Sequence, residues 1–136
     1  GKYEPADLTV VQTAIRETEE EIGVPASLSR ILGTLTPLFI PPSNFIVTPV
    51  VASSGSRPEF MADPVEVAEI IEIEIDSLLN PENRKRKKVI VGKAKPFWVP
   101  SYYINKKVIW GATAMILSEF VELAMEFVNQ DKEKSG

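Results

Sequence analysis

The sequence has 136 residues, of which 44% are hydrophobic and 25% charged, a balance typical of one globular domain. Its formal net charge of −4 argues against general nucleic-acid binding, which needs a basic surface. The absence of Cys and His excludes disulfides, thiolate nucleophiles and Ser-His-Asp chemistry. It also leaves oxygen atoms as the donors for any metal, which favours Mg²⁺ or Mn²⁺ over Zn²⁺. No apolar run approaches the roughly 20 residues of a membrane span and no signal peptide is visible, so we expect a cytoplasmic protein.

The first predicted element is a helix over residues 8–22, with Asp7 as its N-cap and with Gly23 and Pro25 ending it. At 100° per residue, an arc of about 80° contains the positions expected to face a core, namely Leu8, Val11, Ile15, Thr18 and Ile22. The opposite arc carries the carboxylates of Glu17, Glu20 and Glu21, which are close enough to repel one another. A Glu-rich helical face is usually solvated surface, but a hard divalent cation would turn this repulsion into attraction.

Further along the chain, residues 29–40 and 45–53 predict a long hairpin around a turn at 41–44, made irregular by Pro37 and Pro49. Composition predicts a loop over 54–64, and alternation predicts a half-buried strand over 70–75. Asp76 is expected to cap a short helix over 77–79.

The C-terminal half begins with a basic run, residues 84–88. Short strands are predicted at residues 89–91 and 97–99. Two more, at residues 102–104 and 108–110, are predicted on either side of a turn at 105–107. A second helix is expected from Gly111 to about Asn129, with a polar, frayed tail after it. This mixture, without strict βαβ alternation, predicts an α+β fold or an α/β/α sandwich around a mixed sheet. We place the domain at residues 1–130 and the tail at 131–136.

The stretch from Arg16 to Val24 reads Arg-Glu-x-x-Glu-Glu-x-Gly-hydrophobic, and in this it resembles the core of the Nudix box. Arg16 precedes Glu20 by four residues and can pair with it. Upstream, Gly1, Glu4, Asp7 and residues 13–15 are similar to the coenzyme A pyrophosphatase branch of that family. Three later segments also resemble this branch, residues 45–51, 66–69 and 109–114.

The resemblance implies a Nudix-type α/β/α sandwich around a mixed β-sheet. Because Gly1 falls inside the box motif, the N-terminal strands of that sheet are expected to be missing, and a partner chain or a homodimer is left open. The implied reaction is metal-dependent hydrolysis of a diphosphate linkage, with coenzyme A or acyl-CoA giving 3′,5′-ADP and 4′-phosphopantetheine. The alternatives are an enzyme that hydrolyses ADP-ribose or a dinucleotide, or a non-catalytic domain that binds a nucleotide. The expected partner is thus a small-molecule nucleotide, and neither nucleic acid nor a membrane.

The same resemblance assigns roles to residues. Glu17, Glu20 and Glu21 would bind Mg²⁺ or Mn²⁺, with Arg16 orienting a carboxylate. The catalytic base is left open between Glu17, Glu66 and Glu69, the last two of which would otherwise belong to a solvated loop.

Other residues are assigned to the substrate. Gly1 and Lys2 would help to hold phosphate. The basic run at 84–88 is either solvated surface or a contact for the 3′-phosphate of coenzyme A, and Trp98, Tyr102 and Tyr103 either pack internally or stack on adenine.

Overall fold

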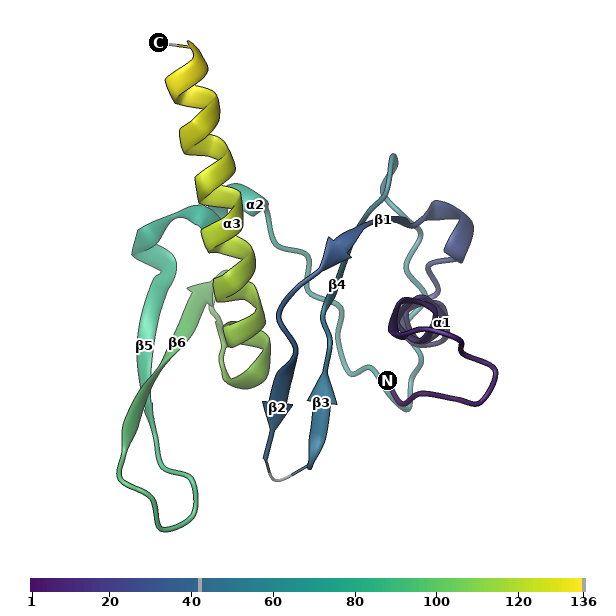
Figure 1. The fold of residues 1–136 in the computed structure, drawn as a ribbon, viewed down its shortest axis with the longest axis horizontal. Coiled ribbons are helices and arrows are strands. Elements are labelled where there is room, and N and C mark those ends of the chain that lie inside the picture. Colours follow the sequence, from purple (N-terminus) through teal and green to yellow (C-terminus); the bar gives the residue numbers. More distant parts are fainter. Residues whose placement is uncertain (42, 136) are drawn as a thin grey trace. The chain divides into compact units, whose positions relative to one another are not determined.

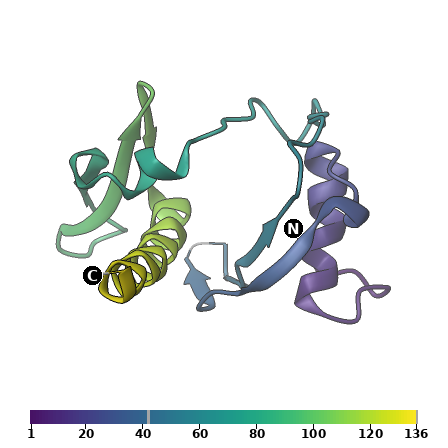
Figure 2. The same ribbon diagram turned by 90° about the horizontal axis from the view of Figure 1, so that it is seen from above.

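The computed structural model describes residues 1–41 and 43–135. Pro42, in the expected turn at 41–44, and Gly136, in the expected tail, lie outside the described residues. The chain divides into two compact units, the first built from residues 1–39 and 45–72 and the second mainly from residues 73–135. Each unit is described separately (Figures 1 and 2).

The first unit opens with a helix, α1 (Val10–Ile22). Thr9 caps it, because its hydroxyl accepts a hydrogen bond from the Gln12 N–H, 3.2 Å away, and the Gln12 side chain accepts in return from the Leu8 N–H. The exchange is close to a capping box. The prediction of Asp7 as N-cap is therefore wrong, and so is the placement of Leu8 on a buried face, since Leu8 lies outside the helix and is 81% exposed.

The predicted end of α1 is confirmed. Gly23 adopts the left-handed conformation, with φ of 72°, and its N–H donates to the Glu19 carbonyl. Residues 26–28 follow as the short 3₁₀ helix η1 (Ala26–Leu28). The nearby side chain of Val24 is buried and, with Leu35, forms the apolar part of the interior of this unit.

The predicted hairpin is present, but prolines divide it into two ladders. β1 (Arg30–Thr34) pairs with β4 (Val50–Ser53) in antiparallel register, with an irregularity between Ile31 and Gly33. β2 (Leu38–Ile40) pairs with β3 (Phe45–Val47) further along the same ribbon (Figure 1). The breaks fall at Pro37 and Pro49, because proline has no N–H to donate to a ladder.

Residues 54–74 contain neither helix nor strand. The loop over 54–64 was predicted, but the predicted strand over 70–75 is wrong: residues 70–74 are irregular and Ile75 begins a helix. Alternation describes the two faces of an extended segment, but a strand also needs a partner for its backbone groups. No partner strand pairs with this segment in the described part of the chain.

The second unit packs a three-stranded antiparallel sheet against a long helix. It begins with α2 (Ile75–Leu79), in which Asp76 lies in the first turn and is not the cap that was predicted. η2 (Pro81–Asn83), β5 (Arg84–Val89), β6 (Phe97–Ile104) and β7 (Lys107–Ile109) follow, and α3 (Gly111–Ser135) ends the chain. The sheet order is β5–β6–β7.

The core of this unit lies between the sheet, α2 and α3. Its buried members are Leu78, Tyr102, Ile104, Ala114 and Val121. Tyr102 is completely buried, so it packs internally and is not available to stack on a base. Asn105 and Lys106 have φ of 52° and 62°, as a tight hairpin turn between β6 and β7 requires.

Several sequence boundaries differ from the structure. The basic run is itself strand β5, and the segments predicted at 97–99 and 102–104 form one continuous strand through Pro100. α3 extends to Ser135, beyond the predicted end at Asn129, because Gln, Lys and Glu are good helix formers and Lys132 and Lys134 lie near the negative end of the helix dipole.

The α+β class is confirmed. Over the described residues, however, the strands form three small sheets and not the single mixed sheet that we expected. The α/β/α sandwich depends on how the two units are arranged and stays a prediction. None of the helices in the described residues has both the length and the apolar character needed to cross a bilayer.

Candidate functional site

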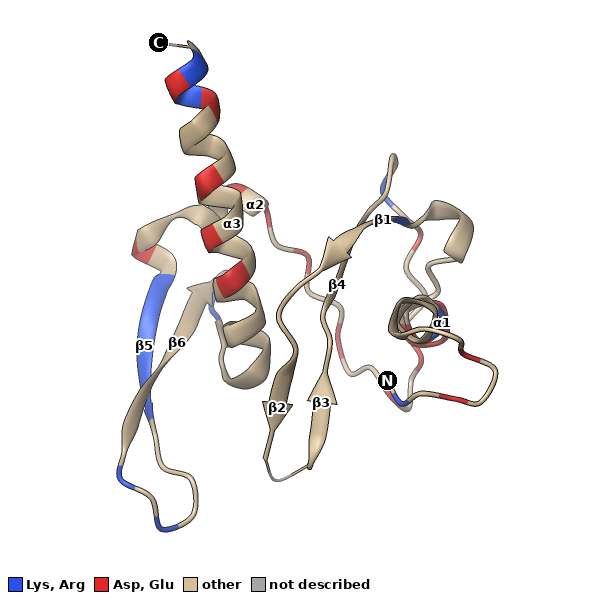
Figure 3. Ribbon diagram, in the orientation of Figure 1, with Lys and Arg blue, Asp and Glu red and all other residues tan. Residues whose placement is uncertain are grey.

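The acidic face of α1 is the part of the first unit where the sequence predicts metal binding, and Figure 3 marks its charges together with those of the loop before it. Thr13 is the one buried residue of α1. It lies on the same side of the helix as Glu17, so the N-terminal loop covers the first half of the acidic face. The carboxylate-bearing second half stays accessible, with the Glu20 side chain 56% and the Glu17 side chain 20% exposed.

Arg16 is the centre of the polar network on this face. Its guanidinium donates to the carboxylate oxygens of Glu17 and Glu20, each at 3.1 Å, which confirms the predicted pairing with Glu20. It also donates to the Asp7 carboxylate, from Nη2 at 3.0 Å and from Nε at 3.2 Å, and to the Lys2 carbonyl at 2.6 Å. These contacts occupy the five N–H donors of the guanidinium, so Arg16 in this arrangement positions other groups and has no donor left for a substrate.

Asp7 is the buried partner of Arg16. Only 5% of it is exposed, and its carboxylate accepts hydrogen bonds from Arg16, from the Glu4 N–H and from the Thr13 hydroxyl. The hydrogen bond from Arg16 is the main reason that the pKa of Asp7 lies below its ordinary value. Hydrogen bonding to Asp7 likewise raises the pKa of Arg16. Both groups therefore stay charged and hold the loop against the helix.

Sequence reasoning missed this role of Asp7. Its position just before a helix suggested a cap, because the local pattern does not reveal a partner nine residues ahead. The signal that could have found it is the box itself, which places an acidic residue upstream of the Arg.

Glu21 lies where negative charges gather. Burial and the neighbouring carboxylate of Glu17 raise the pKa of Glu21, and Glu66 raises it further. Glu66 therefore lies close enough to Glu21 for their charges to repel. A bound cation would relieve this repulsion.

The loop that carries Glu66 is fixed to the C-terminal end of α1. The Met61 and Asp63 N–H groups donate to the carbonyls of Ile22 and Glu21, at 2.9 Å and 2.8 Å, and so satisfy two acceptors that a helix end leaves open. The Asp63 carboxylate in turn accepts from the N–H groups of Val65 and Glu66. This chain of contacts brings Glu66 to the acidic face. Glu69 follows in the same loop as an exposed residue.

Gly1 and Lys2 also lie at this face. A Cβ on Gly1 would overlap the side chain of Glu17, so the loop approaches that carboxylate as only glycine can. The Lys2 carbonyl is held by Arg16, while its ammonium group lies 5.6 Å from the centre of the Phe45 ring. The structure thus brings together Gly1, Lys2, Arg16, Glu17, Glu20, Glu21 and Glu66.

The chemistry of this donor set fits a hard divalent cation, because the candidate ligands are carboxylates and the pKa of one is already raised by its neighbours. Among the described residues, no three Asp or Glu side chains converge on a common point as a finished metal site would. Arg16 explains this, since it draws Glu17 and Glu20 toward its own guanidinium. Binding a metal here would require these side chains to rotate.

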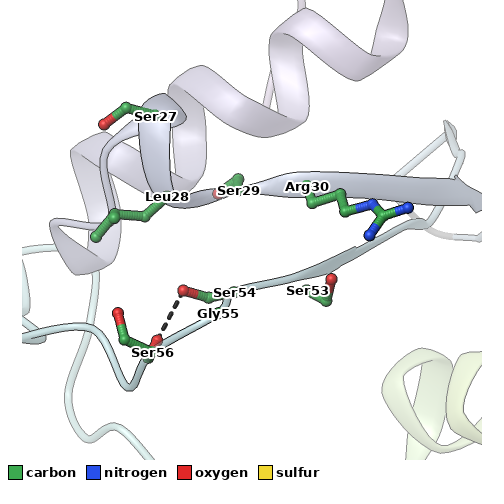
Figure 4. A pocket seen from close by; sticks show the side chains of 8 residues that line it. All are labelled: Ser27, Leu28, Ser29, Arg30, Ser53, Ser54, Gly55 and Ser56. Carbon is green, nitrogen blue, oxygen red and sulfur yellow. Dashed lines mark hydrogen bonds between the residues drawn. The ribbon is translucent and has the colours of Figure 1, made fainter.

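Two hollows of the described surface lie elsewhere. One, of about 550 Å³, is lined by residues 27–30 and 53–56 where β1 and β4 meet η1 (Figure 4), and the Ser54 hydroxyl donates to the Ser56 carbonyl there. Another, of about 490 Å³, lies in the second unit beside β5 and β6. Neither contains a residue of the acidic face.

The comparisons with known proteins agree with the motif. The chain belongs to the Nudix family, because the model of the NUDIX domain matches residues 1–92, which include α1, the loop with Glu66 and β5.

Among individual proteins, the chain is similar to three described as "Uncharacterized Nudix hydrolase NudL". That of Photorhabdus laumondii subsp. laumondii is 30% identical over 122 residues, which are 90% of this chain and 64% of the relative. Those of Yersinia enterocolitica and Yersinia pestis are 34% and 33% identical over 122 residues, 62% and 60% of their lengths. The chain thus spans about three fifths of the length of the curated relatives it matches.

Proposed function

We propose that this protein hydrolyses the diphosphate linkage of a nucleoside diphosphate derivative, with Mg²⁺ or Mn²⁺ bound by Glu17, Glu20 and Glu21. The observation that carries the proposal is the arrangement on α1, where one guanidinium holds Glu17 and Glu20. Burial and the nearby carboxylates of Glu17 and Glu66 raise the pKa of Glu21 beside them. Membership of the Nudix family supports a divalent cation at this place.

Each group then has a task. When bound, the cation would neutralise phosphoryl oxygens and lower the pKa of the attacking water. Arg16 pairs with the carboxylates of Glu17 and Glu20 and keeps them on this face, from which they would rotate onto the cation. Arg16 itself does not contact the substrate. Gly1 leaves room beside Glu17, and Lys2 supplies a positive charge for a phosphate group.

The proton acceptor is one of three carboxylates. Glu66 is the best placed of the two loop candidates, because the hydrogen bonds of Met61 and Asp63 bring it to Glu21. Glu17 is the candidate on the helix itself, and Glu69 is the remaining loop residue. A general base must lie within hydrogen-bond reach of the water that it activates. Glu66→Gln and Glu69→Gln therefore test the two loop candidates separately. Retained activity in both variants would leave Glu17, which is also a proposed metal ligand.

Coenzyme A or an acyl-CoA is the proposed substrate. The support is the sequence resemblance to the coenzyme A pyrophosphatase branch, at residues 1–15 and in three later segments. The products would be 3′,5′-ADP and a 4′-phosphopantetheine.

The test is hydrolysis followed by product separation. The 136-residue chain, and any longer form that the gene encodes, are incubated with Mg²⁺ or Mn²⁺ and coenzyme A, ADP-ribose or a dinucleotide. We expect 3′,5′-ADP from coenzyme A. Products from ADP-ribose or the dinucleotide alone would refute the substrate, and binding without any product would identify a non-catalytic nucleotide-binding domain.

A further inference from the structure

The positive charge of this chain is concentrated on one hairpin. We define the basic hairpin as residues 84–104, which comprise β5, the turn at 90–96 and β6. It contains seven of the chain's 15 Lys and Arg residues and none of its 19 Asp and Glu residues; the seven are Arg84, Lys85, Arg86, Lys87, Lys88, Lys93 and Lys95. Figure 3 shows them along β5 and at the turn. The net charge of −4 therefore conceals a strongly positive surface.

These cations are largely unneutralised. Among the described residues only Arg84 of the seven has a carboxylate partner, Glu122, at 3.9 Å. All but Lys87 are exposed, and the ammonium group of Lys87 lies 4.0 Å from the centre of the Trp110 ring. Successive side chains of a strand point to opposite faces, so Arg84, Arg86 and Lys88 form a row on one face of β5 and Lys85 and Lys87 lie on the other. A polyanion on the first face would find cations that no carboxylate of the hairpin offsets.

The register places one exposed aromatic side chain, that of Trp98, among these charges. Arg84, Arg86 and Lys88 lie opposite Tyr102, Pro100 and Trp98 of β6, and residues directly opposite share a face of the sheet. Trp98 is 59% exposed, with the Lys88 ammonium group 6.0 Å from the centre of its ring.

A hollow beside these residues can receive a ligand. It measures about 490 Å³ and is lined in part by Arg84, Arg86, Trp98 and Ser118, within the usual size range of ligand sites. The Ser118 hydroxyl accepts from the Arg84 guanidinium at 2.7 Å. Cations that follow a backbone and an aromatic ring on which a base stacks are the two elements of single-strand recognition.

We propose that the basic hairpin binds single-stranded nucleic acid, with β5 contacting the phosphates and Trp98 stacking on a base. A single nucleoside diphosphate would occupy only part of a strand that is six residues and roughly 20 Å long. An anionic bilayer would contact the turn, where exposed Ile90 and Val91 lie near Lys93 and Lys95. It fits less well than a nucleic acid, because it gives no role to the Trp98 ring beside the cations of β5. The proposal revises the expectation drawn from net charge, and it does not depend on the hydrolase chemistry.

The experiment is fluorescence anisotropy of a labelled oligouridylate of about 12 nucleotides, titrated with the full 136-residue chain at several salt concentrations. We expect binding at about 50 mM salt that weakens steeply as salt rises. The double variant Arg86→Gln/Lys88→Gln should reduce the slope of log K against log salt by about 1.4, from two contacts at about 0.7 each. Trp98→Ala should weaken binding by about 5-fold to 150-fold, the range for one stacked base.

The matched control is Lys132→Gln/Lys134→Gln, which removes the same charge from the exposed end of α3, and circular dichroism of each variant checks the fold. The proposal is overturned by absence of binding at low salt, by equal losses in the two double variants, or by binding to phosphatidylserine vesicles without binding to the oligonucleotide. Nucleic-acid binding is measured without substrate, so its failure and a failure of the hydrolase proposal are separate results.

Discussion

Gly23 offers a sharp test of how α1 and the Glu66 loop are joined. It ends α1 with φ of 72°. A Cβ at this position would lie 2.9 Å from the Met61 Cβ and 3.2 Å from the Met61 nitrogen and oxygen. Gly23→Ala therefore imposes an unfavourable backbone conformation and also pushes against a neighbouring chain segment.

The two costs can be separated by a second glycine. Gly111 has φ of 69°, but no described atom within 4 Å of an added Cβ. Gly111→Ala should therefore cost only the left-handed conformation, about 1–2 kcal/mol. Gly23→Ala should carry the same cost and in addition weaken two backbone hydrogen bonds, those of Met61 and Asp63, each contributing about 0.5–1.5 kcal/mol. The expected totals are about 2–5 kcal/mol for Gly23→Ala and about 1–2 kcal/mol for Gly111→Ala.

Amide hydrogen exchange measured by NMR reports the effect residue by residue. In Gly23→Ala the Met61 and Asp63 amides should lose protection, by roughly tenfold for each 1.4 kcal/mol, and hydrolysis should fall because Glu66 is carried by the same loop. In Gly111→Ala both amides should keep their protection. Equal loss of stability in the two variants, with Met61 still protected in Gly23→Ala, would refute the steric account.

Three further predictions concern catalysis, pH and the core. Glu20→Gln should greatly lower hydrolysis while the circular dichroism spectrum stays unchanged. The control Glu19→Gln, on the opposite side of α1, should retain activity. Equal activity in the two variants would remove Glu20 from the site. The pKa of Asp7 lies below its ordinary value of 3.8, so Asp7 contributes stability above pH 3.8 that is lost as the pH falls through the pKa of the folded state. Denaturant titrations of the wild type and Asp7→Asn should therefore give different free energies of unfolding at pH 7 and converging values in acid. A difference that stays constant with pH would contradict this linkage. The buried Tyr102 hydroxyl has no hydrogen-bond partner among the described residues. In a denaturant titration, Tyr102→Phe should therefore leave the free energy of unfolding unchanged or raise it by about 1–3 kcal/mol. A clear loss of stability would show that the hydroxyl is hydrogen-bonded.

Periodicity predicted the helices well because each helix satisfies its backbone within one segment. The acidic arc of α1, its end at Gly23 and the start of α3 at Gly111 all follow from local spacing. The strand expected at 70–75 failed for the opposite reason, since a strand depends on a partner that one segment cannot specify.

The site shows the same division. Spacing alone paired Arg16 with Glu20, four residues apart on one helix. It could not place Asp7, whose contacts with Arg16 and Thr13 depend on a loop folding back. Nor could it show that Met61 and Asp63 fix the Glu66 loop to the helix end, because these are contacts between segments some 40 residues apart.

The saturated guanidinium of Arg16 has a consequence for how the proposed site would acquire a metal. Small metalloproteins whose ligands repel one another often fold only when the ion arrives. Here an internal cation already pairs with two of the candidate ligands and ties the preceding loop to them. We therefore expect the polypeptide to fold in the presence of a chelator. Loading would then be an exchange in which an incoming ion competes with the Arg16 side chain, and Glu17 and Glu20 rotate from one cation to the other.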